Sequence, residues 1–191
     1  LVGSEMCIRD RYGTVAFISY LFGGVLADKF SPKKLLSFSL IFTSFGGFYM
    51  MSYPSYFSLQ LLYAYWGFTT VFLFWAPMIK ATTIIGGLNK QGKTFSFLDA
   101  GRVIVASSIG LIGVLIFSLV VIGDISDLTI NEKQVAFRYV IAASSAIVFL
   151  TGVIVYFSLN IKIKDVANIG DFSDMKNLVK SKSVILIGLI I

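Results

Sequence analysis

Long apolar runs separated by short polar loops constrain this chain more than any other feature of its sequence. Four runs are complete, at 35–53, 56–78, 103–122 and 139–159, with 19, 23, 20 and 21 residues. A helix needs about 20 apolar residues to cross about 30 Å of hydrocarbon. The chain is 57% hydrophobic and 14% charged, whereas soluble domains are about a quarter charged. We therefore expect an all-α, polytopic bundle of membrane helices, with a 93–122 helix that includes the third run.

Shorter apolar runs lie near both ends of the chain. The run at 12–27 predicts a further membrane helix, so that the bundle occupies residues 12–161. The run at 184–191 is only eight residues long, and we expect it to be the start of a membrane helix that continues beyond this sequence. Residues 162–183 are expected to form a cytoplasmic loop between the bundle at 12–161 and the helix start at 184–191.

The first eleven residues resemble the translation of a transposase sequencing adapter, and we expect residues 1–11 to be foreign to the natural protein. A native polar lead-in is the alternative, because this stretch is charged and has no apolar core. It contains Cys7, the only cysteine, and the chain has no histidine. We therefore expect no disulfide, no metal and no cofactor, and we do not expect an enzyme.

The basic residues predict which side of the membrane each loop faces. Twelve lie in or beside the first, third and fifth loops, against two in the second and fourth. The positive-inside rule then makes the odd-numbered loops cytoplasmic. Because these loops face anionic lipid headgroups, they explain the net charge of +6 without a nucleic-acid partner. The twelve are Lys29, Lys33, Lys34, Lys80, Lys90, Lys93, Arg102, Lys162, Lys164, Lys176, Lys180 and Lys182.

The first cytoplasmic loop has an ordered pattern of a glycine, an acid and several bases, carried by Gly24, Asp28, Lys29 and Lys33. This pattern resembles the loop between the second and third helices of the major facilitator superfamily. The resemblance implies a twelve-helix transporter of which this chain covers helices two to six and the start of seven. It also implies a gating role for the four residues, in which Asp28 meets a helix start in the other half of the protein.

Two residues of this loop depart from the family pattern. Ser31 replaces a usual glycine and Pro32 a usual base. We expect Ser31 to cap the next helix and Pro32 to occupy its first turn, where the missing N–H would have no partner.

Asp99 and Arg102 are the charged residues that lie deepest in a predicted membrane helix. Their i, i+3 spacing allows them to pair on one helical face. Ionisable groups at this depth usually line a cavity, which makes both residues candidates for the substrate path. In the alternative, both lie among the headgroups, with Arg102 reaching outward. Arg102 can bind a carboxylate or phosphate through two N–H groups, and Lys80 offers a second positive charge.

The stretch from Trp75 to Arg102 also resembles the sugar-phosphate permease-like branch of the superfamily, which implies an organic-anion substrate. Tyr63 and Trp66 precede this stretch and are candidates for stacking on a sugar ring, with packing against lipid or neighbouring helices as the alternative. Pro77 is expected to bend its helix near the cytoplasmic end. The bend can belong to a gate or be a tolerated irregularity.

These features together predict a secondary active transporter in the cell membrane, with the lipid bilayer as its surroundings. It would move a small polar solute, an organic anion or sugar phosphate, by alternating access, with or without a coupling ion. A membrane sensor of the same fold, which binds the solute without moving it, is the alternative from another class. Net flux through vesicles separates the two hypotheses.

Overall fold

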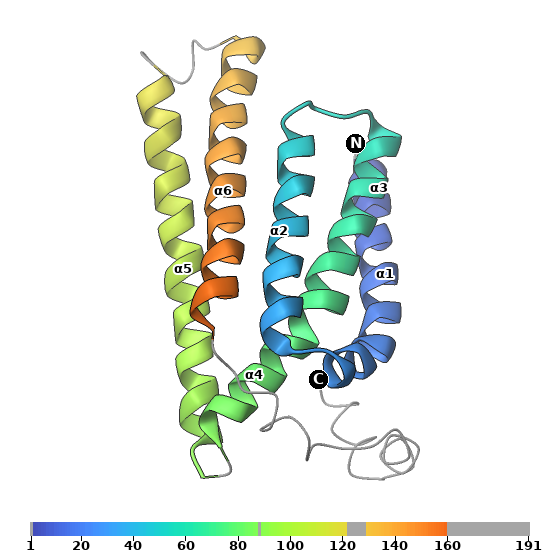
Figure 1. Ribbon diagram of the computed structural model, residues 1–191. Coiled ribbons are helices and arrows are strands. Elements are labelled where there is room, and N and C mark those ends of the chain that lie inside the picture. Colours follow the sequence, from blue (N-terminus) through green and yellow to red (C-terminus); the bar gives the residue numbers. More distant parts are fainter. Residues whose placement is uncertain (1, 88, 122–128, 160–191) are drawn as a thin grey trace. The chain divides into compact units, whose positions relative to one another are not determined.

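The computed structural model describes residues 2–87, 89–121 and 129–159, and these residues are organised as helices (Figure 1). The expected loop at 162–183, its lysines and the expected helix start at 184–191 lie outside the described residues. The elements are α1 (Val2–Lys29), α2 (Pro32–Met50), α3 (Tyr56–Gly67), η1 (Phe68–Trp75), α4 (Ala76–Gly86), α5 (Gln91–Val120) and α6 (Ile130–Ser158). The all-α expectation is confirmed for these residues.

The helix bounds differ most from expectation at the two ends of the bundle. α1 begins at Val2, well before residue 12, so the stretch resembling an adapter continues the first helix without a break. Its foreign origin stays a prediction. α6 begins at Ile130, nine residues before the apolar run at 139–159. A capping box begins this helix, in which the Thr129 backbone N–H and hydroxyl both donate to Glu132 Oε2 at 2.8 Å.

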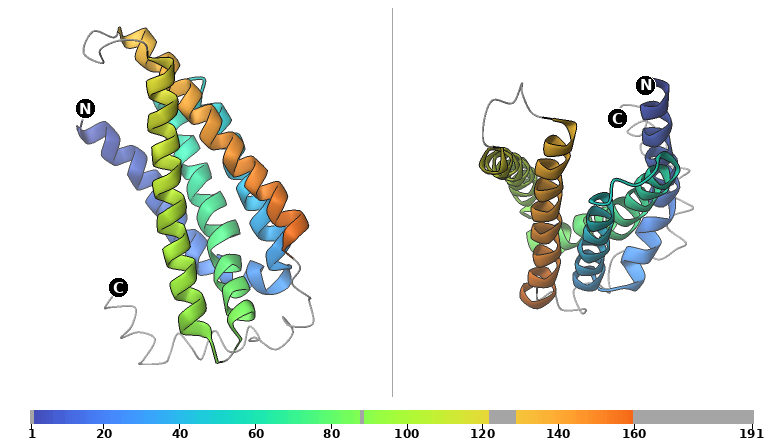
Figure 2. Two further views of the ribbon diagram at one scale, coloured as in Figure 1. Left: turned by 90° about the vertical axis from the view of Figure 1, so that its left-hand side faces the viewer. Right: turned by 90° about the horizontal axis from the view of Figure 1, so that it is seen from above.

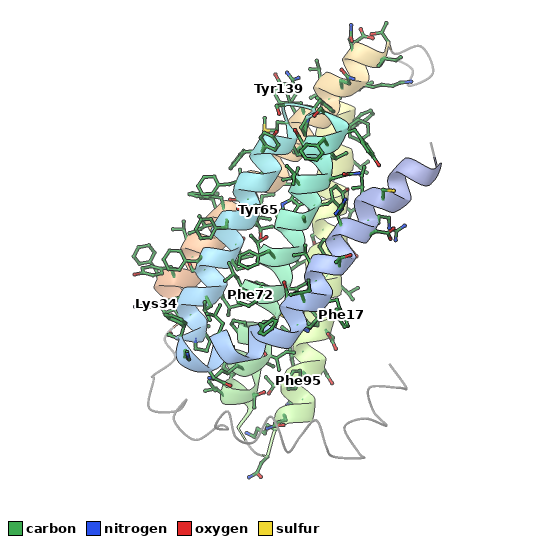
Figure 3. The ribbon with its side chains drawn as sticks, turned by 90° about the vertical axis from the view of Figure 1, so that its right-hand side faces the viewer. Phe17, Lys34, Tyr65, Phe72, Phe95 and Tyr139 are labelled. Carbon is green, nitrogen blue, oxygen red and sulfur yellow. The ribbon has the colours of Figure 1, made fainter. Side chains whose placement is uncertain are left out.

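Among the described residues, three helical runs are long and apolar enough to cross a membrane: Tyr56–Gly86, Gln91–Val120 and Ile130–Ser158. The first run combines α3, η1 and α4. The junctions from α1 to α2 and from α4 to α5 lie at one end of the described bundle, while α2 turns into α3 at the other end (Figure 1). Lys34 and Tyr139 lie toward these opposite ends in Figure 3. The assignment of the first end to the cytoplasm stays a prediction from the basic residues.

Small residues allow the helices of this bundle to pack closely. α2 packs extensively along α6, and α1 packs on α3 and η1 (Figure 2). A Cβ added to Gly47 would run into the Ser145 hydroxyl, and one added to Gly67 would lie 2.8 Å from the Tyr12 carbonyl oxygen. Van der Waals contact between such low surfaces is a main source of helix association in lipid.

The eight residues of η1 adopt a π-helix in the middle of the first membrane run. Pro77, which follows almost directly, has no N–H to donate to the Leu73 carbonyl, and its ring crowds that carbonyl in an α-helix. A wider turn before the proline relieves this conflict. The Ser39 hydroxyl from α2 donates to the Thr69 carbonyl oxygen of η1 at 2.8 Å. The irregularity expected at Pro77 is therefore present, as a widened helix.

Candidate functional site

The cytoplasmic end of α1 is held by an ion pair with α4. Lys80 Nζ lies 2.9 Å from Asp28 Oδ1 and donates a second hydrogen bond, also 2.9 Å long, to the Ala27 carbonyl oxygen. The Lys80 side chain is only 7% exposed, whereas that of Asp28 is 49% exposed. The lysine of this ion pair is therefore buried, whereas the aspartate remains accessible to a further partner.

Helix electrostatics explain why a lysine is needed here. Asp28 lies in the last turn of α1, where the negative end of the helix dipole disfavours a carboxylate. The last carbonyl groups of a helix also have no partner within the helix. Lys80 neutralises the carboxylate and satisfies the Ala27 carbonyl with one ammonium group. The ammonium in turn has two acceptors, which offsets the cost of its burial.

The structure gives Asp28 a partner that the sequence did not predict, Lys80 on α4. The expected contact of Asp28 with a helix start in the other half of the protein stays a prediction. Lys80 is held by two acceptors, Asp28 and the Ala27 carbonyl, and its candidacy as a substrate-binding residue also stays a prediction. α1 approaches η1 closely at Gly23 rather than at Gly24: a Cβ on Gly23 would lie 3.4 Å from the Phe72 carbonyl oxygen, whereas one on Gly24 would meet nothing within 4 Å among the described residues.

The remaining loop residues have distinct surroundings. Ser31 occupies the N-cap position of α2, but its side chain makes no capping hydrogen bond, so that expectation is wrong, while Pro32 does lie in the first turn. Because Pro32 fixes its own φ, the helix start does not depend on the serine hydroxyl. Lys33 Nζ lies 5.4 Å from the ring centroid of Tyr156 on α6, and Lys29 is exposed.

The predicted pairing of Asp99 with Arg102 is confirmed. Arg102 Nη1 lies 3.2 Å from Asp99 Oδ1, and the two side chains are 52% and 71% exposed. The guanidinium carbon also lies 4.9 Å from the ring of Trp75, the last residue of η1. Arg102 thus contacts its own helix on one side and an aromatic face of the preceding membrane run on another.

The position of Arg102 along α5 gives this pair its functional interest. Arg102 follows the first residue of α5, Gln91, by eleven positions, or about 17 Å along a helix axis. The apolar run at 103–122 begins at the next residue, so Arg102 lies at the start of the apolar part of α5, where an arginine can line a cavity or reach the headgroups. Its single ion pair leaves other guanidinium N–H groups for an anion.

Tyr63 and Trp66 lie apart from both ion pairs. Their rings meet edge to face with centroids 5.5 Å apart, and both line a cavity of about 350 Å³ between α2, α3 and α6. Hydroxyl groups of Thr43, Ser44, Ser144 and Ser145 share this lining. The five candidate binding residues therefore divide into three places rather than one: Lys80 with Asp28, Asp99 with Arg102, and Tyr63 with Trp66.

The ion pair of Asp28 with Lys80 was not predicted, because the two residues are 52 positions apart in the sequence. A usable signal did exist, since Asp28 and Lys80 were both expected near the cytoplasmic membrane edge and carry opposite charges. The contact of Trp75 with Arg102 was also not predicted, although the two residues bound the stretch that resembles the sugar-phosphate permease-like branch. Within the described residues, no group of three or more His, Cys, Asp or Glu side chains could hold a metal ion.

Comparison with known proteins adds the cellular context. No family model matches the chain, and no solved structure matches it. It is 26% identical over 193 residues to the inner membrane protein YihN of Escherichia coli, covering 97% of this chain and 43% of that protein. It is 27% identical over 150 residues to the inner membrane protein YqcE of the same organism, covering 78% of this chain and 33% of YqcE.

The chain thus spans less than half the length of both relatives. Their names and the three apolar helical runs agree on the environment of the chain. The chain is part of a multi-pass inner membrane protein.

Proposed function

We propose that the complete protein is a secondary transporter of the major facilitator type, which moves a small organic anion across the inner membrane by alternating access. The observation that carries this proposal is the ion pair between Asp28 and Lys80. It lies in the loop whose residues resemble the gating loop of that superfamily. It also ties the end of one membrane helix to another, as an anchored gate requires.

The exposure of the two partners suggests how the loop works. Lys80 is buried and holds Asp28 Oδ1, while about half of the Asp28 side chain stays exposed. The exposed part of the carboxylate can meet a helix start in the other half of the protein when the cytoplasmic side closes, because helix N-termini attract anions. Lys80 would keep Asp28 in place for that contact during each cycle.

Arg102 supports an anionic solute. Its planar guanidinium can bind two oxygens of a carboxylate or phosphate at once. Asp99 supplies one carboxylate already, so a solute would compete with Asp99 for the guanidinium. Because Asp99 is exposed, it loses little when water replaces the arginine. The site can therefore exchange its internal anion for a transported one.

Uptake by the complete protein in proteoliposomes tests this function. We expect saturable uptake of radiolabelled glucose 6-phosphate or gluconate, and little uptake of uncharged glucose. Net flux of either anion supports a transporter. Saturable binding of an anion without flux would contradict transport and favour the membrane sensor.

A further inference from the structure

Trp75 lies where the anion candidate Arg102 meets the preceding membrane run. It is the last residue of η1 and precedes Pro77 by two positions. The centroid of its ring lies 4.9 Å from the guanidinium carbon of Arg102. This distance is within the range at which a cation is attracted by the face of an aromatic ring, and tryptophan is the strongest of the aromatic partners.

Arg102 needs such a support. A free arginine side chain has many rotamers, and ordering it costs conformational entropy. The pair with Asp99 is a poor anchor by itself, because both side chains are more than half exposed and the pair is within one helix. The indole contact comes from a different element. A guanidinium that stacks on a ring by its flat face keeps its N–H edge available for hydrogen bonds.

We propose that Trp75 is a positioning residue of the anion site, holding the Arg102 guanidinium so that its N–H groups face the solute. This inference rests on the proposed function. It also links the two ion pairs, because Trp75 precedes Lys80 by only five residues on the same helical run.

Two substitutions of Trp75 in the complete protein test the role. Uptake of glucose 6-phosphate into proteoliposomes gives KM and kcat for each variant. Trp75→Leu retains an apolar side chain without an aromatic face, and we expect the apparent KM to rise about three- to tenfold. We expect kcat to change by less than about twofold, since a preorganised arginine acts on binding. Trp75→Phe keeps an aromatic face and should recover most of the affinity.

The matched control is Tyr53→Leu, which removes the ring 5.6 Å from Arg138 at the turn between α2 and α3. It should leave the KM unchanged. An unchanged KM in Trp75→Leu, or a fall in kcat alone, would overturn the inference. If Arg102→Ala abolishes uptake while Trp75→Leu has no effect, the inference fails and the proposed function stands. If Arg102→Ala transports with a normal KM, the anion site itself is wrong.

Discussion

The two ion pairs among the described residues each join an aspartate to a basic side chain, but they are held very differently. Asp28 and Lys80 come from different helices, and the ammonium is buried with a second acceptor, the Ala27 carbonyl. Asp99 and Arg102 lie three positions apart on one helix, and both side chains are largely exposed. The first pair fixes one element against another, whereas the second leaves its cation free to change partner.

The energetics of ion pairs explain why this difference matters. An exposed pair contributes about 0–1 kcal/mol, since water solvates its charges almost as well. Removing one partner of a buried pair costs about 3–5 kcal/mol, because the other charge is left without compensation. A loop anchor benefits from the second kind of pair. A solute site benefits from the first, since a tightly bound internal carboxylate would exclude the solute.

The largest effect is expected for Arg102→Ala, which removes the exchangeable cation. Charged hydrogen bonds contribute about 1.5–3 kcal/mol each, so losing a two-pronged contact should lower kcat/KM for an anion at least about a hundredfold. Uptake of glucose 6-phosphate in proteoliposomes measures this loss. Arg102→Lys is the matched control and should retain part of the activity, because lysine keeps the positive charge but lacks the paired N–H donors of the guanidinium. Equal activity in all three proteins would contradict the assignment.

The next largest effect is a difference in the stability lost when either partner of the pair between Asp28 and Lys80 is replaced. Asp28→Asn keeps an acceptor oxygen but leaves the buried ammonium without a counter-charge, which should lower stability by about 3 kcal/mol. Lys80→Met strands a carboxylate that water already reaches, and should cost only about 1 kcal/mol. Melting followed by tryptophan fluorescence in detergent measures both. Exchanging the two residues should restore stability only partly, because an aspartate at position 80 cannot donate to the Ala27 carbonyl. If Lys80→Met lowers the stability as much as Asp28→Asn does, the predicted order is wrong.

A smaller effect should arise from a buried hydroxyl that touches neither pair. Ser39→Ala removes the hydroxyl that donates to the Thr69 carbonyl of η1, which should lower stability by about 1 kcal/mol. Thermal melting measures the loss. The KM for an anion and the accessibility of the cytoplasmic side should both stay at their wild-type values. A changed KM would contradict this prediction and would show that other residues of the π-helical segment, besides Trp75, affect the anion site.

The smallest effect is expected for Asp99→Asn. The amide no longer competes as an anion for the guanidinium, while the exposed pair it replaces contributes little. The apparent KM for glucose 6-phosphate should therefore fall by about twofold, with a weaker dependence on salt. A large rise in KM would mean that Asp99 is an anchor, in which case the two pairs are more alike than their exposure indicates.

The success of sequence reasoning here depended on the separation of the residues concerned. Apolar runs and proline positions are local signals, and they predicted the helical architecture and the irregularity before Pro77. The pair of Asp99 with Arg102 was predictable because helix geometry alone brings positions i and i+3 together. The capping by Ser31 failed because a side-chain hydrogen bond also depends on its rotamer and on competing groups, which the sequence does not specify.

Contacts between distant segments were beyond the same reasoning. The pairing of Asp28 with Lys80 depends on how α1 packs against α4, and the contact of Trp75 with Arg102 depends on how η1 lies beside α5. Gly23 rather than Gly24 faces Phe72 because of the rotation of α1 about its own axis. A rotation of one residue position, about 100°, decides such contacts, and apolar patterning alone constrains it weakly in lipid.

The most direct test of the account measures two quantities in parallel for Asp28→Asn and Arg102→Lys in the complete protein. One is the KM for glucose 6-phosphate, and the other is the labelling rate of a cysteine placed in the cytoplasmic opening. We predict a crossed pattern: Asp28→Asn changes labelling with a nearly normal KM, while Arg102→Lys raises the KM with normal labelling. Variants that each change both quantities to the same degree would contradict the division of roles between the two pairs.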